Sequence, residues 1–223
     1  MIKLYHISPA NDSMGGSRNA AKVSIALREL GEEFEAINLD REKDLRPPSA
    51  QYRKEINPNG VTPAIEDDGL VLWESSAILR HLADTRGGLI GKDAKSKAIT
   101  QQWLSWEGAT FQPAFLGYYF AVLGNYQADL KESALLQYFD KLNILDQRLS
   151  RTGSFITGDY SIADIALGMV IPIGFHLGID LKDYKNVVRW LNLLSDRSAW
   201  RKEPAFNNDM QVGREKGYLP IKT

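Results

Sequence analysis

Polar residues stand at two points where the chain is expected to change into a helix. Ser17 comes directly before a run of apolar residues at helical spacing, which ends at Gly31, a residue typical of helix C-caps. Glu74 and Ser75 follow a short apolar strand pattern and begin a second helical pattern. The free N–H groups and the positive dipole end of a helix start favour an anion. We therefore expect an anionic ligand group at Glu74 and Ser75, the alternative being that Ser75 only caps the helix.

The elements around these residues alternate between strand and helix at first and are helical afterwards. Strands are expected at residues 2–7, 34–39, 61–65 and 70–72, and helices at 21–30 and 74–83. Pro63 interrupts its strand, and such a position is typical of a cis X-Pro bond. Beyond Arg86 only helical patterns follow, at residues 95–123, 130–149, 162–173 and 184–197. The sequence therefore predicts an α/β layer followed by an all-helical part.

Composition excludes several kinds of site. The 223 residues carry a net charge of −1, so no basic field is available to hold nucleic acid or an anionic membrane. The absence of cysteine excludes disulfides, thiolate metal sites and a cysteine nucleophile. His6, His81 and His176 are far apart in the sequence and form no metal-ligand pattern. No signal peptide or membrane span is evident, so the cytoplasm is the expected location.

Three segments together resemble the glutathione transferase family. The first, Asn57–Ile65, is similar to the family segment that holds a cis proline, with Thr62 here in place of the usual valine. The second, Glu74–Ile78, matches the family's Glu-Ser-x-Ala-Ile signature. The third is similar to the family's N-capping box, in which Ser161 caps a helix and Asp164 reaches back to the backbone of Ser161.

The resemblance implies a glutathione transferase fold and a homodimeric enzyme. Its parts are an α/β thioredoxin-like N-terminal domain at residues 1–84, a linker at 85–93 and an all-α C-terminal domain at 94–223. Such an enzyme is expected to conjugate the thiolate of its co-substrate, reduced glutathione, to an electrophilic apolar small molecule in detoxification, without a metal. The residues implied at the glutathione site are Val61, Thr62, Pro63, Glu74, Ser75 and either Lys54 or Gln51.

A donor must stabilise the glutathione thiolate, because a free thiol has a pKa of about 8.5 and is largely protonated at neutral pH. In the family this donor stands near the first strand or the start of the first helix. Ser17 is the first candidate, and Asn19 is a second donor in the nu-like pattern of the family. Tyr5 is the rival, at the position used by tyrosine-type members. Ser17 as a plain N-cap and Tyr5 as a packing residue are the structural alternatives; Ser8 and Ser13 also lie in the loop between them.

The helical part carries a dense aromatic stretch that suits an apolar second substrate. Most of these rings are expected in the helix core, but Phe115 and either Tyr118 or Tyr119 are expected in the second-substrate pocket. Pro113 is expected to disturb the helix there. Two other functions fit the same fold. One is glutathione-dependent reduction of a disulfide or peroxide, and the other is ligand binding without turnover.

Overall fold

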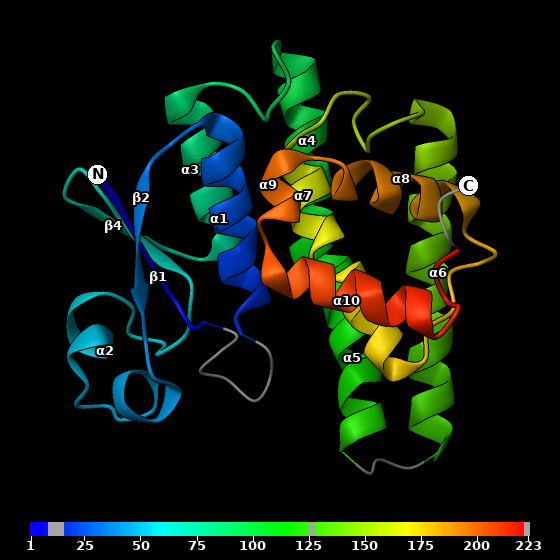
Figure 1. Cartoon of the computed structure of the whole chain (residues 1–223), viewed down its shortest axis with the longest axis horizontal. Helices are drawn as coiled ribbons and strands as arrows, with labels where there is room; N and C mark the ends of the chain where they lie inside the picture. The colour runs from blue at the N-terminus through cyan, green and yellow to red at the C-terminus, as the bar shows by residue number, and fades with distance from the viewer. Residues whose placement is uncertain (9–15, 125–127, 221–223) are drawn as a thin grey trace.

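The computed structural model describes residues 1–8, 16–124 and 128–220, and it begins with a mixed sheet (Figure 1). Its strands are β1 (Ile2–His6), β2 (Phe34–Asn38), β3 (Ala64–Asp67) and β4 (Leu70–Trp73). The strand order is β2-β1-β3-β4. β1 is parallel to β2 and antiparallel to β3, and β3 and β4 form a hairpin.

Helix α1 (Arg18–Leu30) has a local capping signal at each end. The Oγ of Ser17 accepts a hydrogen bond from the backbone N–H of Ala20 at 3.2 Å. Gly31 closes the helix with φ 74°, in the left-handed region that suits glycine. Helix α3 (Ser75–Arg86) shares one core with α1, and Ile2 and Leu4 of β1 pack into it. Both helices therefore cover the sheet face to which Ile2 and Leu4 point.

The opposite face of the sheet carries a smaller core and two short helical segments. These segments are a π-helical turn, Arg41–Leu45, and helix α2 (Gln51–Glu55). The buried residues of this core are Ile7, Leu39, Leu45, Tyr52 and Ala64. The side chain of Asp40 caps the turn by accepting from the N–H groups of Glu42 and Lys43.

From residue 94 onward the structure is helical. Its helices are α4 (Ala94–Trp106), α5 (Gln112–Leu123), α6 (Ala128–Thr152), α7 (Ile162–Gly168), α8 (Lys185–Ser195), α9 (Ser198–Arg201) and α10 (Pro204–Glu215). A π-helical segment, Glu107–Phe111, joins α4 to α5, and a 3-10 helix spans Ile171–Leu177. None of the helices in the described ranges has the length and apolarity needed to cross a membrane.

The helical part differs from the sequence expectations in three places. The pattern at residues 95–123 forms two helices joined by a π-helical segment, beside Pro113, where a disturbance is expected. The N–H of Gln112 bonds to the carbonyl of Glu107, and Pro113 has no N–H. The helix expected at residues 162–173 ends at Gly168 and continues as the 3-10 helix. Helices α9 and α10 were not expected at all. The division at residues 85–93 remains a prediction; α3 ends at Arg86 and α4 begins at Ala94.

Helix α1 lies between the sheet and the helical part, where charged pairs hold it (Figure 1). Nζ of Lys22 lies 2.9 Å from Oε1 of Glu107, and both side chains are buried. Oε2 of Glu203, the residue before α10, accepts hydrogen bonds from Ser24 at 2.7 Å and from Arg28 at 3.1 Å. Removing one partner of a buried pair leaves an uncompensated charge, so these contacts fix the position of α1.

Candidate active site

The register of the sheet gathers the predicted glutathione-site residues at one end. Tyr5 pairs with Ala64, and Ala64 pairs with Trp73. The end of β1, the start of β3 and the end of β4 therefore lie side by side. Thr62 and Pro63 precede β3 and Glu74 follows β4, so the two signature segments meet at this end, although they are 11 or 12 positions apart in sequence.

The loop before β3 is held in place by two side chains that the sequence did not single out. The carbonyl of Val61 accepts a hydrogen bond from the hydroxyl of Tyr52 and one from Nδ2 of Asn57, each at 2.8 Å. Asn57 is buried, and its Oδ1 accepts from the N–H of Asn59. The bond between Thr62 and Pro63 is cis, as predicted. The Asx turn at Asn57 was the available sequence signal for this support.

Helix α3 begins at Ser75 with an unusual backbone at its N-cap. Glu74 has φ 72° and ψ 114°, a conformation that costs a non-glycine residue on the order of 1–3 kcal/mol. The side chain of Glu74 is exposed and makes no capping hydrogen bond. Ser75 is the first residue of the helix and not its cap, so the capping alternative for Ser75 is not met. The first N–H groups of α3 are thus without a side-chain cap, beside an exposed carboxylate.

Ser17 is both a helix cap and a hydroxyl that can act on a ligand. Its backbone N–H donates to the carbonyl of Ile7 at 3.2 Å, which ties the start of α1 to the end of β1. A serine hydroxyl has one hydrogen to donate and two acceptor positions. The Oγ of Ser17 uses one acceptor position for the N–H of Ala20, and its hydroxyl hydrogen remains available to a ligand. Capping and thiolate stabilisation are therefore compatible roles.

A cavity of about 620 Å³ opens between the start of α1 and the helical part. Ser17 and Asn19 border it on one side, and Phe115 and Tyr119 border it on the other. The rings of Phe115 and Tyr119 are one helical turn apart on α5, with centroids 6.0 Å apart. The predicted donors and these two aromatic residues therefore share one cavity.

Tyr118 does not line this cavity. Its side chain is buried between α5 and α6, where the ring stacks on Tyr138. Its hydroxyl donates to the carbonyl of Leu177 at 3.2 Å, and burial raises its pKa. Of the two tyrosines left open by the aromatic spacing, only Tyr119 lines this cavity.

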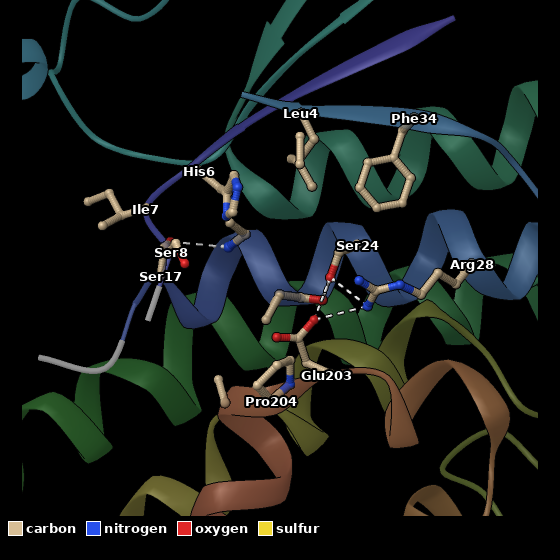
Figure 2. A pocket seen from close by; sticks show the side chains of 14 residues that line it. Leu4, His6, Ile7, Ser8, Ser17, Ser24, Arg28, Phe34, Glu203 and Pro204 are labelled. Atoms are coloured by element: carbon tan, nitrogen blue, oxygen red, sulfur yellow. Dashed lines mark hydrogen bonds and ion pairs between the residues drawn. The ribbon is translucent and has the colours of Figure 1, made fainter. Parts of the chain in front are cut away.

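A smaller cavity of about 190 Å³ lies on the other side of Ser17, between β1, α1 and the start of α10 (Figure 2). In Figure 2, Ser8 and Ser17 stand at one end of it, and Ser24, Arg28 and Glu203 form a bonded cluster at the other. Among residues 1–8, 16–124 and 128–220, no group of His, Cys, Asp or Glu side chains is arranged to hold a metal ion.

Comparison with known proteins decides the family. Residues 16–85 match the family model of the glutathione S-transferase N-terminal domain. The chain is 30% identical to glutathione S-transferase GstB of Escherichia coli K12 over 195 residues, which cover 83% of this chain and 92% of GstB. The chain belongs to the glutathione S-transferase family.

Other relatives agree with this assignment. The chain is 31% identical to the disulfide-bond oxidoreductase YghU of Escherichia coli K12, with 86% of this chain and 73% of YghU covered. Its fold is similar to that of a glutathione transferase family member from Pseudomonas fluorescens with two glutathione bound. The TM-score is 0.74 and the identity is 28%, over 94% of this chain and 92% of that chain. The α/β thioredoxin-like part and the helical part are those of a glutathione transferase fold.

Tyr5 is placed away from the start of α1 in this glutathione transferase. It belongs to the smaller core on the sheet face opposite α1, because neighbouring residues of a strand point to opposite faces. Its ring packs on Tyr52, and its hydroxyl donates to Oε2 of Glu66 at 3.3 Å. Burial, followed by the charge of Glu66, raises the pKa of Tyr5. This geometry favours Ser17 and Asn19 over Tyr5 as donors to a thiolate.

The variant Tyr5→Phe is therefore expected to keep kcat and KM for glutathione within about twofold of the unsubstituted chain, because the lost hydroxyl donates to Glu66 on the sheet face opposite α1. Steady-state kinetics with 1-chloro-2,4-dinitrobenzene would measure both constants. A fall in kcat of tenfold or more, with the melting temperature unchanged, would return Tyr5 to the candidate donors.

Lys54 is exposed on α2, and its part in the glutathione site stays a prediction. Ser13 lies outside the described residues. The sequence missed Arg18, His176 and Asn208, which also border the larger cavity. Two of these three lie in the 3-10 helix and in α10, at the far end of the chain from Ser17, so no local motif connects them to the site.

Proposed function

We propose that the chain joins the sulfur of reduced glutathione to an electrophilic, largely apolar small molecule. The observation that supports this most is the position of Ser17, at the N-terminus of α1 and on the border of the larger cavity. Phe115 and Tyr119 give that cavity an aromatic wall suited to an apolar electrophile. Glutathione is proposed at the sheet end formed by the Thr62–Pro63 bond and the start of α3, where Glu74 pairs with its ammonium group.

The proposed reaction is a displacement or an addition at carbon. The thiolate sulfur forms a bond to the electrophilic carbon, and in a displacement the leaving group departs with the bonding pair. Before that step the thiol proton passes to water. A hydrogen bond from Ser17, with the dipole of α1, is expected to lower the thiol pKa by about 1–2 units.

Calorimetric titration with glutathione and with S-hexylglutathione tests this proposal. Glutathione is expected to bind, and the hexyl conjugate is expected to bind at least about tenfold more tightly because its chain is removed from water in the larger cavity. Absence of binding by both ligands at millimolar concentration would leave the fold in place and contradict the transferase function. Equal affinities for glutathione and S-hexylglutathione would contradict the apolar pocket but not the glutathione site.

The variant Glu74→Gln is expected to raise the Kd for glutathione about tenfold, because a charge-assisted hydrogen bond to the ammonium group is lost. The kcat at saturating glutathione is expected to stay within about threefold, since Glu74 holds the peptide and not the sulfur. Glu132→Gln, at an exposed position of α6, is the matched control. An unchanged Kd in Glu74→Gln would remove Glu74 from the glutathione site.

Reduction of a disulfide is the second candidate function. The likeness to YghU and to a relative with two glutathione bound favours it. Two glutathione molecules would reduce one disulfide, giving two thiols and one glutathione disulfide. Activity on 2-hydroxyethyl disulfide, coupled to glutathione reductase and compared with activity on 1-chloro-2,4-dinitrobenzene, would rank the two reactions. A chain that binds glutathione but catalyses neither reaction would be a binding protein of the same fold.

The proposal includes a homodimer, a cytoplasmic location and a role in detoxification, as the family resemblance implies. Support for the dimer comes from β4, where Leu70, Val71 and Trp73 are exposed large hydrophobic residues on one edge of the sheet. Light scattering after size-exclusion chromatography is expected to give about twice the mass of one chain. A monomer mass at micromolar concentration would contradict the dimer.

A further inference from the structure

The larger cavity has a charged and polar side as well as its aromatic wall. Besides Ser17 and Tyr119, the polar residues that line it are Arg18, Asn19, Arg41, Gln112, His176 and Asn208. Two of these are arginines, which stay charged at any pH of interest. None of the lining residues within the described ranges is an aspartate or a glutamate. A purely apolar electrophile would leave this side unused.

A single buried carboxylate holds two of these residues in place. Oδ1 of Asp209, on α10, lies 2.7 Å from Nη2 of Arg18 and 2.8 Å from Nε2 of His176. Oδ2 of Asp209 accepts from Nε of Arg18 at 3.3 Å. The sequence separations are 191 and 33 residues, so only the packing of α10 across α1 and the 3-10 helix creates this group.

The acidic and basic side chains of this group differ in how far they are buried. The Asp209 side chain is 1% exposed, whereas those of Arg18 and His176 are 15% and 38% exposed. Asp209 does not line the cavity, and the two side chains that it orients do. Because Nε2 of His176 is engaged by Asp209, the imidazole is fixed in one orientation at the cavity wall. The cavity therefore presents cationic and donor groups, while the acid that positions them is hidden behind them.

We propose that Arg18 and His176 bind an anionic group, of the carboxylate type, on the second substrate, and that Asp209 is the positioning residue for both. This inference rests on the proposed function and specifies its substrate class: an electrophile with an apolar ring and a carboxylate at the opposite end. The Arg18 guanidinium suits such a group, and His176 in its imidazolium form donates Nε2–H to Asp209 and keeps its Nδ1–H for a carboxylate oxygen. Charge-assisted hydrogen bonds to a carboxylate are stronger than neutral ones.

The carboxylate could come from the electrophile itself or from a second glutathione unit. Both sources offer the same chemistry to Arg18 and His176. If the carboxylate belongs to the electrophile, acidic electrophiles are expected to react faster than their neutral esters. If it belongs to a second glutathione unit, the chain is expected to bind glutathione disulfide. The experiment therefore has one arm for each source.

The first arm compares 4-chloro-3,5-dinitrobenzoate with its methyl ester. In both, the glutathione sulfur forms a bond to the ring carbon and chloride leaves with the bonding pair. The two compounds differ in the group para to the reacting carbon, which is an anionic carboxylate in one and a neutral methyl ester in the other. Each kcat/KM is divided by the uncatalysed rate constant with free glutathione. The acid is expected to exceed the ester by about tenfold in this normalised rate. His176→Gln, Arg18→Gln and Asp209→Asn are each expected to reduce that ratio at least about threefold.

Arg28→Gln is the matched control, because Arg28 lies on the same helix but faces the smaller cavity and bonds to Glu203. It is expected to leave the acid-to-ester ratio unchanged. Arg18→Lys keeps a positive charge and is expected to retain more of the ratio than Arg18→Gln. A purely structural role of these residues would lower both rates together and leave the ratio constant. Melting temperatures of all variants check that they are folded.

The second arm titrates glutathione disulfide into the original chain and into His176→Gln by calorimetry. A Kd raised about tenfold in the variant assigns the anion site to a second glutathione unit. The glutathione S-conjugates of the acid and of the ester are titrated in the same way, and their Kd values compare acid with ester in the absence of turnover. The inference would be overturned if the acid and the ester had equal affinities and equal normalised rates, and if His176→Gln left the Kd for glutathione disulfide unchanged.

The proposed function is judged separately. It would stand if the chain still converted the ester and Ser17→Ala abolished that turnover. It would be contradicted if the chain converted neither compound and did not bind glutathione.

Discussion

Replacing Ser17 by alanine is expected to lower kcat/KM for glutathione conjugation at pH 7 by about 10- to 100-fold. Ser17 is the hydroxyl at the start of α1, and it keeps its hydrogen to donate while its oxygen caps the helix. Without that donor the pKa of bound glutathione is expected to rise by about 1–2 units, which leaves most of the thiol protonated at neutral pH. The ultraviolet absorbance of the thiolate, followed during a pH titration of the complex, measures this pKa.

Two further substitutions separate the hydroxyl from the cap. Ser17→Gly removes the hydroxyl at a cost of only a few tenths of a kcal/mol in capping, whereas the alanine substitution costs about 1 kcal/mol. Equal losses of activity in both variants would assign the effect to the hydroxyl, and Ser17→Thr is expected to restore part of it. Full turnover in Ser17→Gly would show that Ser17 is only a cap. Asn19, on the border of the same cavity, would then be the next donor to test.

Replacing Asp164 by alanine is expected to lower the free energy of unfolding by on the order of 3–5 kcal/mol. The carboxylate of Asp164 is buried and accepts from the N–H of Ile156, from both the N–H and the hydroxyl of Ser161, and from the indole N–H of Trp190. The distances lie between 2.9 and 3.0 Å. All four donors would lose their acceptor inside a dry core. Urea unfolding followed by circular dichroism measures the change.

A second capping box in the same chain provides the control for this effect. Asp93 accepts from the N–H of Ser96, whose hydroxyl accepts in turn from the N–H of Asp93, at the exposed start of α4. Asp93→Ala is expected to cost only about 1 kcal/mol, because water replaces the lost acceptor. The two boxes differ chiefly in burial. Similar losses in Asp93→Ala and Asp164→Ala would show that the buried contacts to Ile156 and Trp190 add little to stability.

Local signals in the sequence determined much of the fold. Ser17 and Gly31 mark both ends of α1, the turn at Asp67–Gly69 joins β3 to β4, and Ser161 and Asp164 form the predicted capping box. Each of these features depends on hydrogen bonds between residues only a few positions apart, so composition and spacing suffice to predict it. The same kind of signal identified Pro63, which the structure has after a cis bond.

Tertiary packing alone decided how these pieces form a site. The register of β1, β3 and β4 places Thr62 and Glu74 at the same end of the sheet and turns Tyr5 to the face opposite α1. Helix α10, which the sequence pattern did not reveal, brings Asp209 to Arg18 across 191 positions. A cavity is the space left between distant elements, and a contact across it depends on how those elements pack rather than on any run of residues. For this reason the sequence predicted the Ser17 hydroxyl, and only the fold showed that it shares a cavity with Arg18 and His176.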